Sequence, residues 1–345
     1  MSQNDLMSQN DLKIISALLY FIVFLFNSGV YSQTEYVGVN LAGAEFGENN
    51  LLDTYNQHYT YPTRAAVDYF VDKGMNVFRL PFRWERLQHT ANAEFNSAEL
   101  SRIKNFVDYA TSKNAFVILD PHNYSRYYGN LIGIDELPVS AFRGFWQRLA
   151  LYFKDYPKVI FGLMNEPHSM ASELWLADAP AAISAIRTIG ATNLILVPGN
   201  GWSGAHSWNS SWYGTPNGTI VQNIVDPADN YAIEVHQYLD DNSSGASDEC
   251  VSSTIGSSRL KDFTRWLRVH EKRGFLGEFG ISANDNCLTA LDDMLDYIDD
   301  NTDVWLGWTY WAAGLWWGDY MFSIEPKIGE DRPQMVILEK HIGNK

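Results

Sequence analysis

Two glutamates each stand at the downstream end of a short apolar run, Glu166 in VIFGLMNEPH and Glu278 in GFLGEFG. An apolar run of about four to eight residues is typical of a buried parallel strand. Burying a carboxylate is costly unless the group is hydrogen-bonded or functional. Two strands that each deliver a carboxylate to one cleft would supply the minimum equipment for hydrolysing a glycosidic bond.

Short apolar runs of this kind recur along the whole chain, with helical patterns between most of them. Eight runs are expected to be strands: 36–41, 76–81, 115–120, 159–164, 194–198, 231–235, 274–278 and 304–311. Six segments are expected to be helices: 63–73, 97–113, 140–153, 255–272, 288–300 and 334–342. Strands that alternate with helices indicate a single-domain α/β fold, a (β/α)8 TIM barrel.

In such a barrel the carboxyl ends of all eight strands open on one face. The residues at or just after these ends are Arg79, His122, Asn165, Glu166, His236, Tyr238, Glu278 and Trp311. Each of them alone has a structural explanation. Eight polar or aromatic residues that agree with the period of the fold indicate a functional site at the barrel mouth.

The composition limits the kinds of molecule that the protein is expected to bind. The formal net charge is −16, which disfavours nucleic-acid binding and is compatible with a neutral substrate. Aromatic residues make up 14% of the chain, and flat rings can serve as platforms for sugars, although packing must explain more than half of them. We find neither a cluster with metal-ligand spacing nor a glycine-rich phosphate loop, so no cofactor and no metal are expected.

The first 32 residues have the pattern of a secretory signal peptide. The run Ile14–Phe26 is apolar except for Ser16, which suits a signal and is short for a membrane span. We expect cleavage after Ser32 and a catalytic domain over residues 33–345, secreted and free of the membrane; an uncleaved anchor is the alternative. The two cysteines of a secreted chain favour one disulfide over two separate buried thiols.

The chain resembles glycoside hydrolase family 5, and within it the endo-β-1,4-glucanases of subfamily 5. The matching stretches cover residues 36–320 and are GVNLAG, NVFRLPF, DPHNYSRYYG, FGLMNEPH, PGNGW, VHQYLDDNSSG with DEC, and GWTYWAAG. The resemblance implies hydrolysis of internal β-1,4-glucosidic bonds. It also implies a disulfide between Cys250 and Cys287.

The resemblance implies that Glu166 is the general acid/base and Glu278 the nucleophile. Arg79 would hold Glu278 as a carboxylate, and Tyr238 would donate a hydrogen bond to it. Retaining enzymes hold the two carboxyl groups about 5–5.5 Å apart, which leaves no room for a water molecule between them. The reaction would therefore retain the anomeric configuration through a covalent glycosyl-enzyme.

The resemblance also implies supporting roles. Asn165 would bind the 2-hydroxyl of the sugar, and Trp311 would stack beneath the sugar ring. His122 and His236 would bind sugar hydroxyls or tune the two glutamates.

Four further residues are expected to bind substrate: Trp202, Tyr124, Tyr127 and Asn123. For the aromatic rings among them, packing under a loop is the competing explanation.

Other functions remain open. A barrel of the same family could cut mannan, xyloglucan or mixed-linkage β-glucan, because subsites select the sugar. A glycan-binding protein without activity is a remote alternative. The partner is expected to be a β-glucan polysaccharide such as cellulose. The sequence does not fix the oligomeric state, and a monomer is the expectation.

Overall fold

The computed structural model describes residues 34–47, 51, 54–134 and 136–343. The predicted signal peptide, residues 1–32, lies outside the described residues. Residues Thr34–Lys345 form one compact unit. Within its described part, no helix is both long and apolar enough to cross a bilayer.

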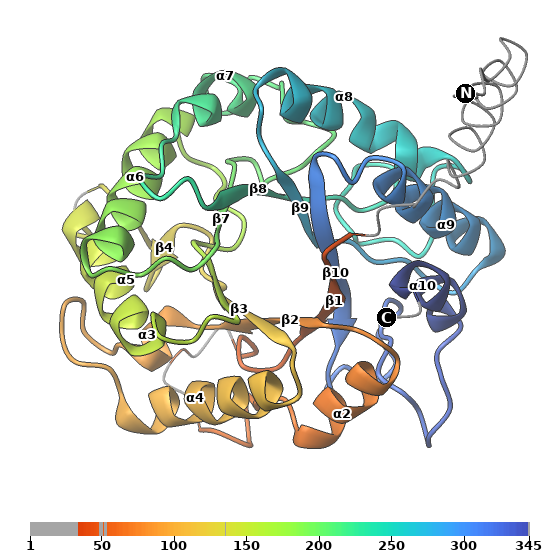
Figure 1. Ribbon diagram of the computed structural model, residues 1–345, viewed down its shortest axis with the longest axis horizontal. Helices are drawn as coiled ribbons and strands as arrows, with labels where there is room; N and C mark the ends of the chain where they lie inside the picture. The colour runs from red at the N-terminus through yellow and green to blue at the C-terminus, as the bar shows by residue number, and fades with distance from the viewer. Residues whose placement is uncertain (1–33, 48–50, 52–53, 135, 344–345) are drawn as a thin grey trace, which may run out of the picture. The chain divides into compact units, whose positions relative to one another are not determined.

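The predicted (β/α)8 barrel is confirmed (Figure 1). Eight parallel strands close in the order β1-β10-β9-β8-β7-β6-β3-β2, and helices surround them. The barrel strands are β1 (Tyr36–Leu41), β2 (Val77–Phe82), β3 (Phe116–Pro121), β6 (Val159–Gly162), β7 (Ile195–Pro198), β8 (Tyr231–His236), β9 (Gly274–Glu278) and β10 (Trp305–Ala313). A small hairpin, β4 (Arg126–Tyr127) with β5 (Asn130–Leu131), lies in the loop after β3.

The helices are α2 (Arg64–Asp72), α3 (Trp84–Leu87), α4 (Ser97–Ser112), α5 (Val139–Phe153), α6 (Ser172–Thr188), α7 (Asn217–Ile220), α8 (Ile255–Val269), α9 (Asp285–Asp299) and α10 (Gln334–Ile342), with a short 3₁₀ turn at Val221–Asn223. Helix α2 shows why they form: the Thr63 side chain accepts a hydrogen bond from the Ala66 N–H, and Ala66, Val67 and Phe70 turn inward. Helix α6 was not predicted, because Pro180 interrupts its pattern.

The barrel interior is built in two layers. A lower, apolar layer contains Val77, Ile118, Ala232 and other strand residues. Side chains two positions further along a strand point to the same face. These positions are Arg79 on β2, Asp120 on β3 and Glu234 on β8, and all three are buried. These three residues form a polar layer, which lies between the apolar layer and the open mouth of the barrel.

The predicted disulfide is confirmed: Cys250, in the loop after β8, is bonded to Cys287 at the start of α9. The bond closes a loop with a sequence separation of 37 residues. We expect the double Cys→Ser variant to lose roughly 3–4 kcal/mol of unfolding free energy, because its unfolded chain is no longer constrained. Urea titrations of both proteins measure this difference, and equal midpoints would contradict the expectation.

Candidate active site

The structure brings together the eight residues that the sequence placed at the barrel mouth. His236 and Glu278 are the last residues of β8 and β9, and Tyr238 lies just beyond β8. Arg79 and Trp311 lie within β2 and β10, His122 lies in the loop after β3, and Asn165 and Glu166 lie in the loop after β6. Hydrogen bonds or ring contacts connect each of them to at least one other member.

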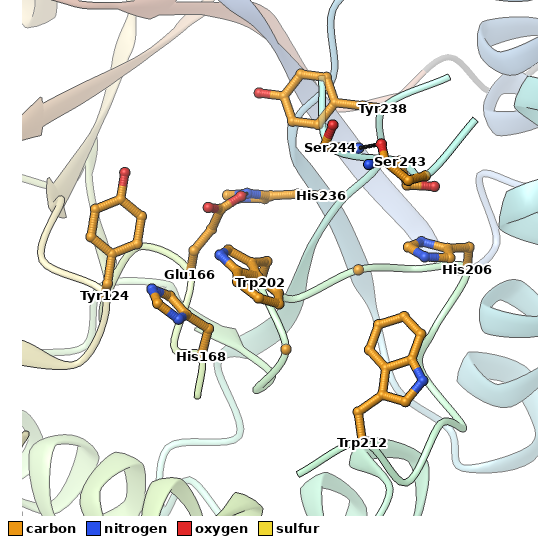
Figure 2. A pocket seen from close by; sticks show the side chains of 13 residues that line it. Tyr124, Glu166, His168, Trp202, His206, Trp212, His236, Tyr238, Ser243 and Ser244 are labelled. Carbon is orange, nitrogen blue, oxygen red and sulfur yellow. Dashed lines mark hydrogen bonds and ion pairs between the residues drawn. The ribbon is translucent and has the colours of Figure 1, made fainter. Parts of the chain in front are cut away.

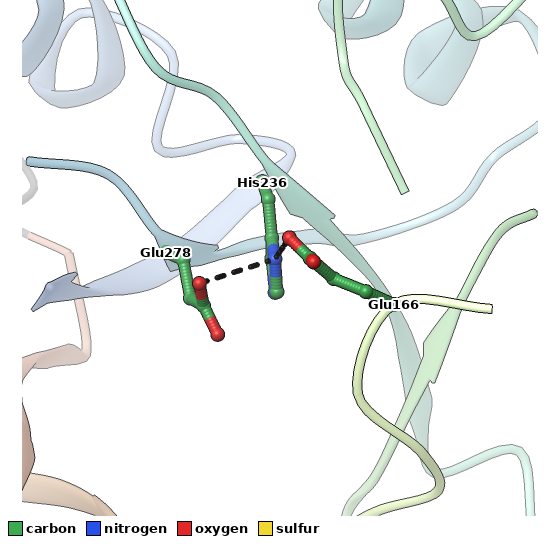
Figure 3. Close-up of side chains that lie close together, drawn as sticks. All are labelled: Glu166, His236 and Glu278. Carbon is green, nitrogen blue, oxygen red and sulfur yellow. Dashed lines mark hydrogen bonds and ion pairs between the residues drawn. The ribbon is translucent and has the colours of Figure 1, made fainter. Parts of the chain in front are cut away.

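Glu166 and Glu278 reach toward each other from different strands, with His236 between them (Figure 3). One carboxylate oxygen of each glutamate and a nitrogen of His236 all lie within 4.8 Å of one another. Glu166 stands beyond the end of β6, at a left-handed backbone φ of 43°. Its side chain is 15% exposed, while that of Glu278 is 5% exposed. Glu166 is thus the carboxylate that faces the open cleft.

Arg79 is the centre of the polar layer and is completely buried. Its Nη1 donates to Glu278 Oε1 at 2.8 Å, and its Nη2 donates to Asn165 Oδ1 at 2.8 Å. Nη1 also lies 3.0 Å from Asp120 Oδ2. Burial alone would lower the pKa of Arg79, but Asp120, Glu234 and Glu278 together raise it. This guanidinium is therefore a permanent cation under the nucleophile candidate.

Tyr238 and Arg79 both hold Glu278. The Tyr238 hydroxyl donates to Glu278 Oε2 at 2.9 Å, opposite the oxygen that Arg79 binds. Burial raises the pKa of Glu278 above its ordinary value, and His236 and Arg79 reduce this rise without cancelling it. Hydrogen bonds to both oxygens favour the charged form.

His236 is a cation. Its Nδ1 lies 2.8 Å from Glu166 Oε1 and 3.6 Å from Glu278 Oε2. Burial lowers its pKa, but Glu278, Glu166 and Glu234 outweigh burial and raise the pKa to about 10. The imidazolium therefore donates to Glu166 and carries positive charge between the two glutamates.

His122 is uncharged, in contrast to His236. Burial lowers the pKa of His122 to about 3, so the ring is neutral. Its Nε2 lies 3.2 Å from Asn165 Nδ2, which is a donor, so Nε2 accepts and Nδ1–H donates to Asp120 Oδ2 at 2.8 Å. Trp311 stacks on His122 with ring centroids 5.4 Å apart and is only 8% exposed. The Trp311 ring is thus held in one orientation against His122.

A groove of about 570 Å³ leads away from Glu166 (Figure 2). Tyr124, Trp202 and Trp212 line it, together with His168 and His206. Trp202 is 42% exposed and stacks on His168, with centroids 4.6 Å apart and the planes 8° from parallel. The structure therefore places the predicted residues Trp202 and Tyr124 in the groove.

The structure does not bring two of the predicted substrate contacts, Tyr127 and Asn123, into this groove. Tyr127 is buried, its ring packs against Trp84 and its hydroxyl donates to the Gln88 carbonyl. Asn123 is also buried, and its Oδ1 accepts from the Trp84 N–H at the start of α3. Both side chains satisfy backbone groups at the ends of α3: Asn123 accepts from an N–H of its first turn, and Tyr127 donates to the carbonyl of Gln88, just after its last residue.

The sequence interpretation missed Asn40, Asp120 and Glu234 as parts of the site. Asn40 Oδ1 accepts from Arg79 Nη1 at 3.0 Å, and its Nδ2 donates to the Gly277 carbonyl. A signal existed for Glu234, since a strand places residues two apart on one face and His236 is two residues further.

Two groups among the described residues have metal-ligand geometry: Glu166, His236 and Glu278, and also Asp292, Asp296 and His341. In the first group, His236 Nδ1 lies 2.8 Å from Glu166 Oε1 and 3.6 Å from Glu278 Oε2. In the second, His341 Nδ1 bonds Asp299 and Nε2 bonds Asp292, so neither nitrogen is available. The prediction that no metal is needed stays a prediction.

Known proteins resemble this chain along most of its length. The family described as cellulase (glycosyl hydrolase family 5) matches residues 35–314. Endo-β-1,4-glucanase A of Emericella nidulans is 42% identical over 296 residues, which are 85% of this chain and 88% of that protein.

Two similar solved structures contain oligosaccharides. XacCel5A in complex with cellopentaose has a TM-score of 0.88 and 48% identity, covering 89% of this chain and 99% of that one. Endoglucanase Cel5A of Pseudomonas stutzeri in complex with cellobiose has a TM-score of 0.83 and 37% identity, covering 90% and 93%.

Proposed function

The chain belongs to glycosyl hydrolase family 5, and we propose that it is a secreted endo-β-1,4-glucanase that hydrolyses internal bonds of β-glucan with retention of configuration. The observation that carries the proposal is the carboxylate pair. One oxygen of Glu166 and one of Glu278 lie within 4.8 Å of each other. This separation suits a retaining enzyme, whereas an inverting one needs about 6.5–9.5 Å for a water molecule.

In the first step, Glu278 attacks the anomeric carbon and the bond to the leaving oxygen breaks. Glu166 gives its proton to that oxygen, so the departing sugar chain leaves with a hydroxyl group. The donors on Glu278, Arg79 and Tyr238, keep it ionised before attack. A covalent glycosyl-enzyme results.

In the second step, Glu166 is a carboxylate and takes a proton from a water molecule. The water oxygen attacks the anomeric carbon, and Glu278 departs as a carboxylate. Two displacements at the same carbon restore the original configuration. The His236 imidazolium beside Glu166 stabilises the negative charge that Glu166 carries between the steps.

The sugar contacts follow from the walls of the cleft. Trp311 offers a ring beside the reacting centre, and Asn165 is close enough to the pair to reach a 2-hydroxyl. Trp202 and Tyr124 bind the chain beyond the cleaved bond. A groove with aromatic walls in a chain of net charge −16 fits an uncharged glucan better than an acidic polysaccharide.

Trp202→Ala should weaken substrate binding more than the chemical step. We expect KM for a soluble cellulose derivative to rise about tenfold, with kcat changed less than threefold, because a stacking ring contributes about 1–1.5 kcal/mol. Tyr152→Ala is the matched control: Tyr152 is 49% exposed, close to the 42% of Trp202, but lies on the outer helix α5. Equal KM values for both variants would show that Trp202 does not bind the substrate.

The proposal is tested by following the anomer of the first product with proton NMR during hydrolysis of cellopentaose. We expect the β anomer first and the α anomer only through later mutarotation. An initial α product would contradict retention.

A substrate panel separates the alternative activities. We expect faster hydrolysis of carboxymethylcellulose than of mannan, xyloglucan or mixed-linkage β-glucan. No hydrolysis of any of them would favour the glycan-binding alternative.

Secretion and oligomeric state need separate measurements. N-terminal sequencing of protein recovered from the medium should start near Gln33, and a start at Met1 would contradict signal cleavage. Light scattering should give the mass of a monomer.

A further inference from the structure

One buried carboxylate below the catalytic pair has no role in the steps above. Glu234 lies on β8 in the polar layer and is 1% exposed. We propose that Glu234 is a positioning residue, which holds Arg79 and His236 in place and sets the pH range in which the two glutamates work. This inference rests on the proposed hydrolase function.

Glu234 contacts both cations of the site from below. Its Oε1 lies 3.0 Å from Arg79 Nε and 3.5 Å from His236 Nε2. On their other sides, Arg79 Nη1 binds Glu278 and His236 Nδ1 faces Glu166, each at 2.8 Å. Glu234 is therefore one contact away from each catalytic glutamate.

The neighbouring strand makes room for this carboxylate. A Cβ atom on Gly277 of β9 would lie only 2.2 Å from Glu234 Oε1. A side chain at position 277 would force Glu234 out of its place. The absence of a side chain there lets the carboxylate reach Arg79 and His236 from inside the barrel.

The charged groups around His236 come from five elements. They are Arg79 on β2, Asp120 on β3, Glu166 after β6, Glu234 on β8 itself and Glu278 on β9. Arg79 is the positive member of this set. The carboxylates favour the imidazolium form of His236, in agreement with its raised pKa.

Glu234 itself keeps its charge. Burial raises its pKa, but Arg79 and His236 outweigh burial and lower it. The carboxylate is therefore a fixed negative charge over the working pH range. A fixed negative charge raises the proton affinity of the titrating groups near it, here Glu278 and His236.

The direction of the pH shift follows from the loss of this charge. Glu234→Gln keeps the shape of the side chain and removes one negative charge. His236 and Glu278 then lose their protons at lower pH. We expect both limbs of the kcat/KM profile to move to lower pH by about one unit, within the usual range for a charge at this distance. At neutral pH we expect kcat to fall about tenfold or more.

The experiment compares kcat/KM profiles of wild type, Glu234→Gln, Glu234→Asp and Asp178→Asn. Glu234→Asp keeps the charge, so its limbs should stay closer to those of wild type. Asp178, on α6, is a matched control: it is also fully buried, and neither of its oxygens has a hydrogen-bond partner in the described structure. Its amide variant should leave both limbs unchanged.

A lower rate in Glu234→Gln without a shift of either limb would reduce Glu234 to a packing role and overturn the proposal. The same holds if Asp178→Asn produces an equal shift. Each variant is first checked by its melting temperature.

A second measurement keeps the inference testable if Glu234→Gln does not fold. In wild type, nitrogen-15 NMR of the His236 ring should show both nitrogens protonated from about pH 5 to pH 8. Titration near the ordinary histidine value would contradict the proposal. This readout needs no substrate, so it stands apart from the test of the hydrolase function.

Discussion

Glu278→Gln is expected to lower kcat/KM for carboxymethylcellulose by about 10⁴-fold or more. The amide keeps the size of the side chain and can still accept from the Tyr238 hydroxyl, but it cannot form the covalent bond to the anomeric carbon. Steady-state release of reducing sugar measures the loss. Because substrate is no longer turned over, calorimetry with cellopentaose should still detect binding by this variant.

The matched control is Glu94→Gln, at a surface side chain that is 85% exposed. It should keep full activity. A Glu278→Gln enzyme within tenfold of wild type would show that another residue is the nucleophile.

Chemical rescue sharpens this prediction. In Glu278→Ala the space of the carboxylate is open, and azide can attack the anomeric carbon from the same side. With a dinitrophenyl β-cellobioside the expected product is the α-glycosyl azide, since a single displacement inverts the configuration. A β-glycosyl azide would show instead that Glu278 is the acid/base residue and not the nucleophile.

Glu166→Gln should have an effect that depends on the leaving group. On carboxymethylcellulose we expect a loss of about 10²–10⁴-fold, since a sugar oxygen needs a proton in order to depart. A dinitrophenyl leaving group needs no proton, so its release should begin with a burst near the wild-type rate. The burst is followed by slow turnover, because the second step has lost its base.

Stopped-flow absorbance resolves the burst from the slow phase. Azide added to Glu166→Ala should accelerate turnover and give the β-glycosyl azide, which separates this residue from Glu278. An equal loss on both substrates, without a burst, would show that Glu166 does not deliver the proton.

The fold was predictable where a local pattern determines it. Strands β1 and β9 have the predicted limits, and the other six barrel strands differ from prediction by one or two residues at one or both ends. Helix α6 was missed because Pro180 and a run of small residues hide its apolar face. The barrel packs this helix against α5, a tertiary contact that overrides weak local preference.

The members of the site were predictable from the expected strand ends, but the contacts that each side chain makes were not. The same loop after β3 contains Tyr124, which lines the groove, and Tyr127, which is buried. Sequence spacing does not separate them, because the direction of each side chain depends on backbone conformation. Tyr124 has a left-handed φ of 56°, which the sequence gives no reason to expect for a tyrosine.

The polar layer of the barrel could be predicted only in part. Arg79 was identified from the expected end of the second strand, although it lies within β2, three residues before the last one; Glu234 lies two residues before the last one of β8. The alternation of strand side chains places both inside the barrel. Their ion pair depends on the closeness of β2 and β8 across the interior, which only the closed barrel produces.

The central claim is that Glu278 forms a covalent bond to the sugar with Glu166 as its acid/base partner. The most direct test is mass spectrometry of the enzyme after reaction with a 2-deoxy-2-fluoro-β-cellobioside carrying a dinitrophenyl leaving group. Fluorine slows both steps, while the activated leaving group keeps the first one fast enough to trap the intermediate. We predict one added fluorocellobiosyl group per chain, located by peptide mapping on Glu278. Labelling at another residue, or rapid release of dinitrophenol without a covalent adduct, would contradict the account.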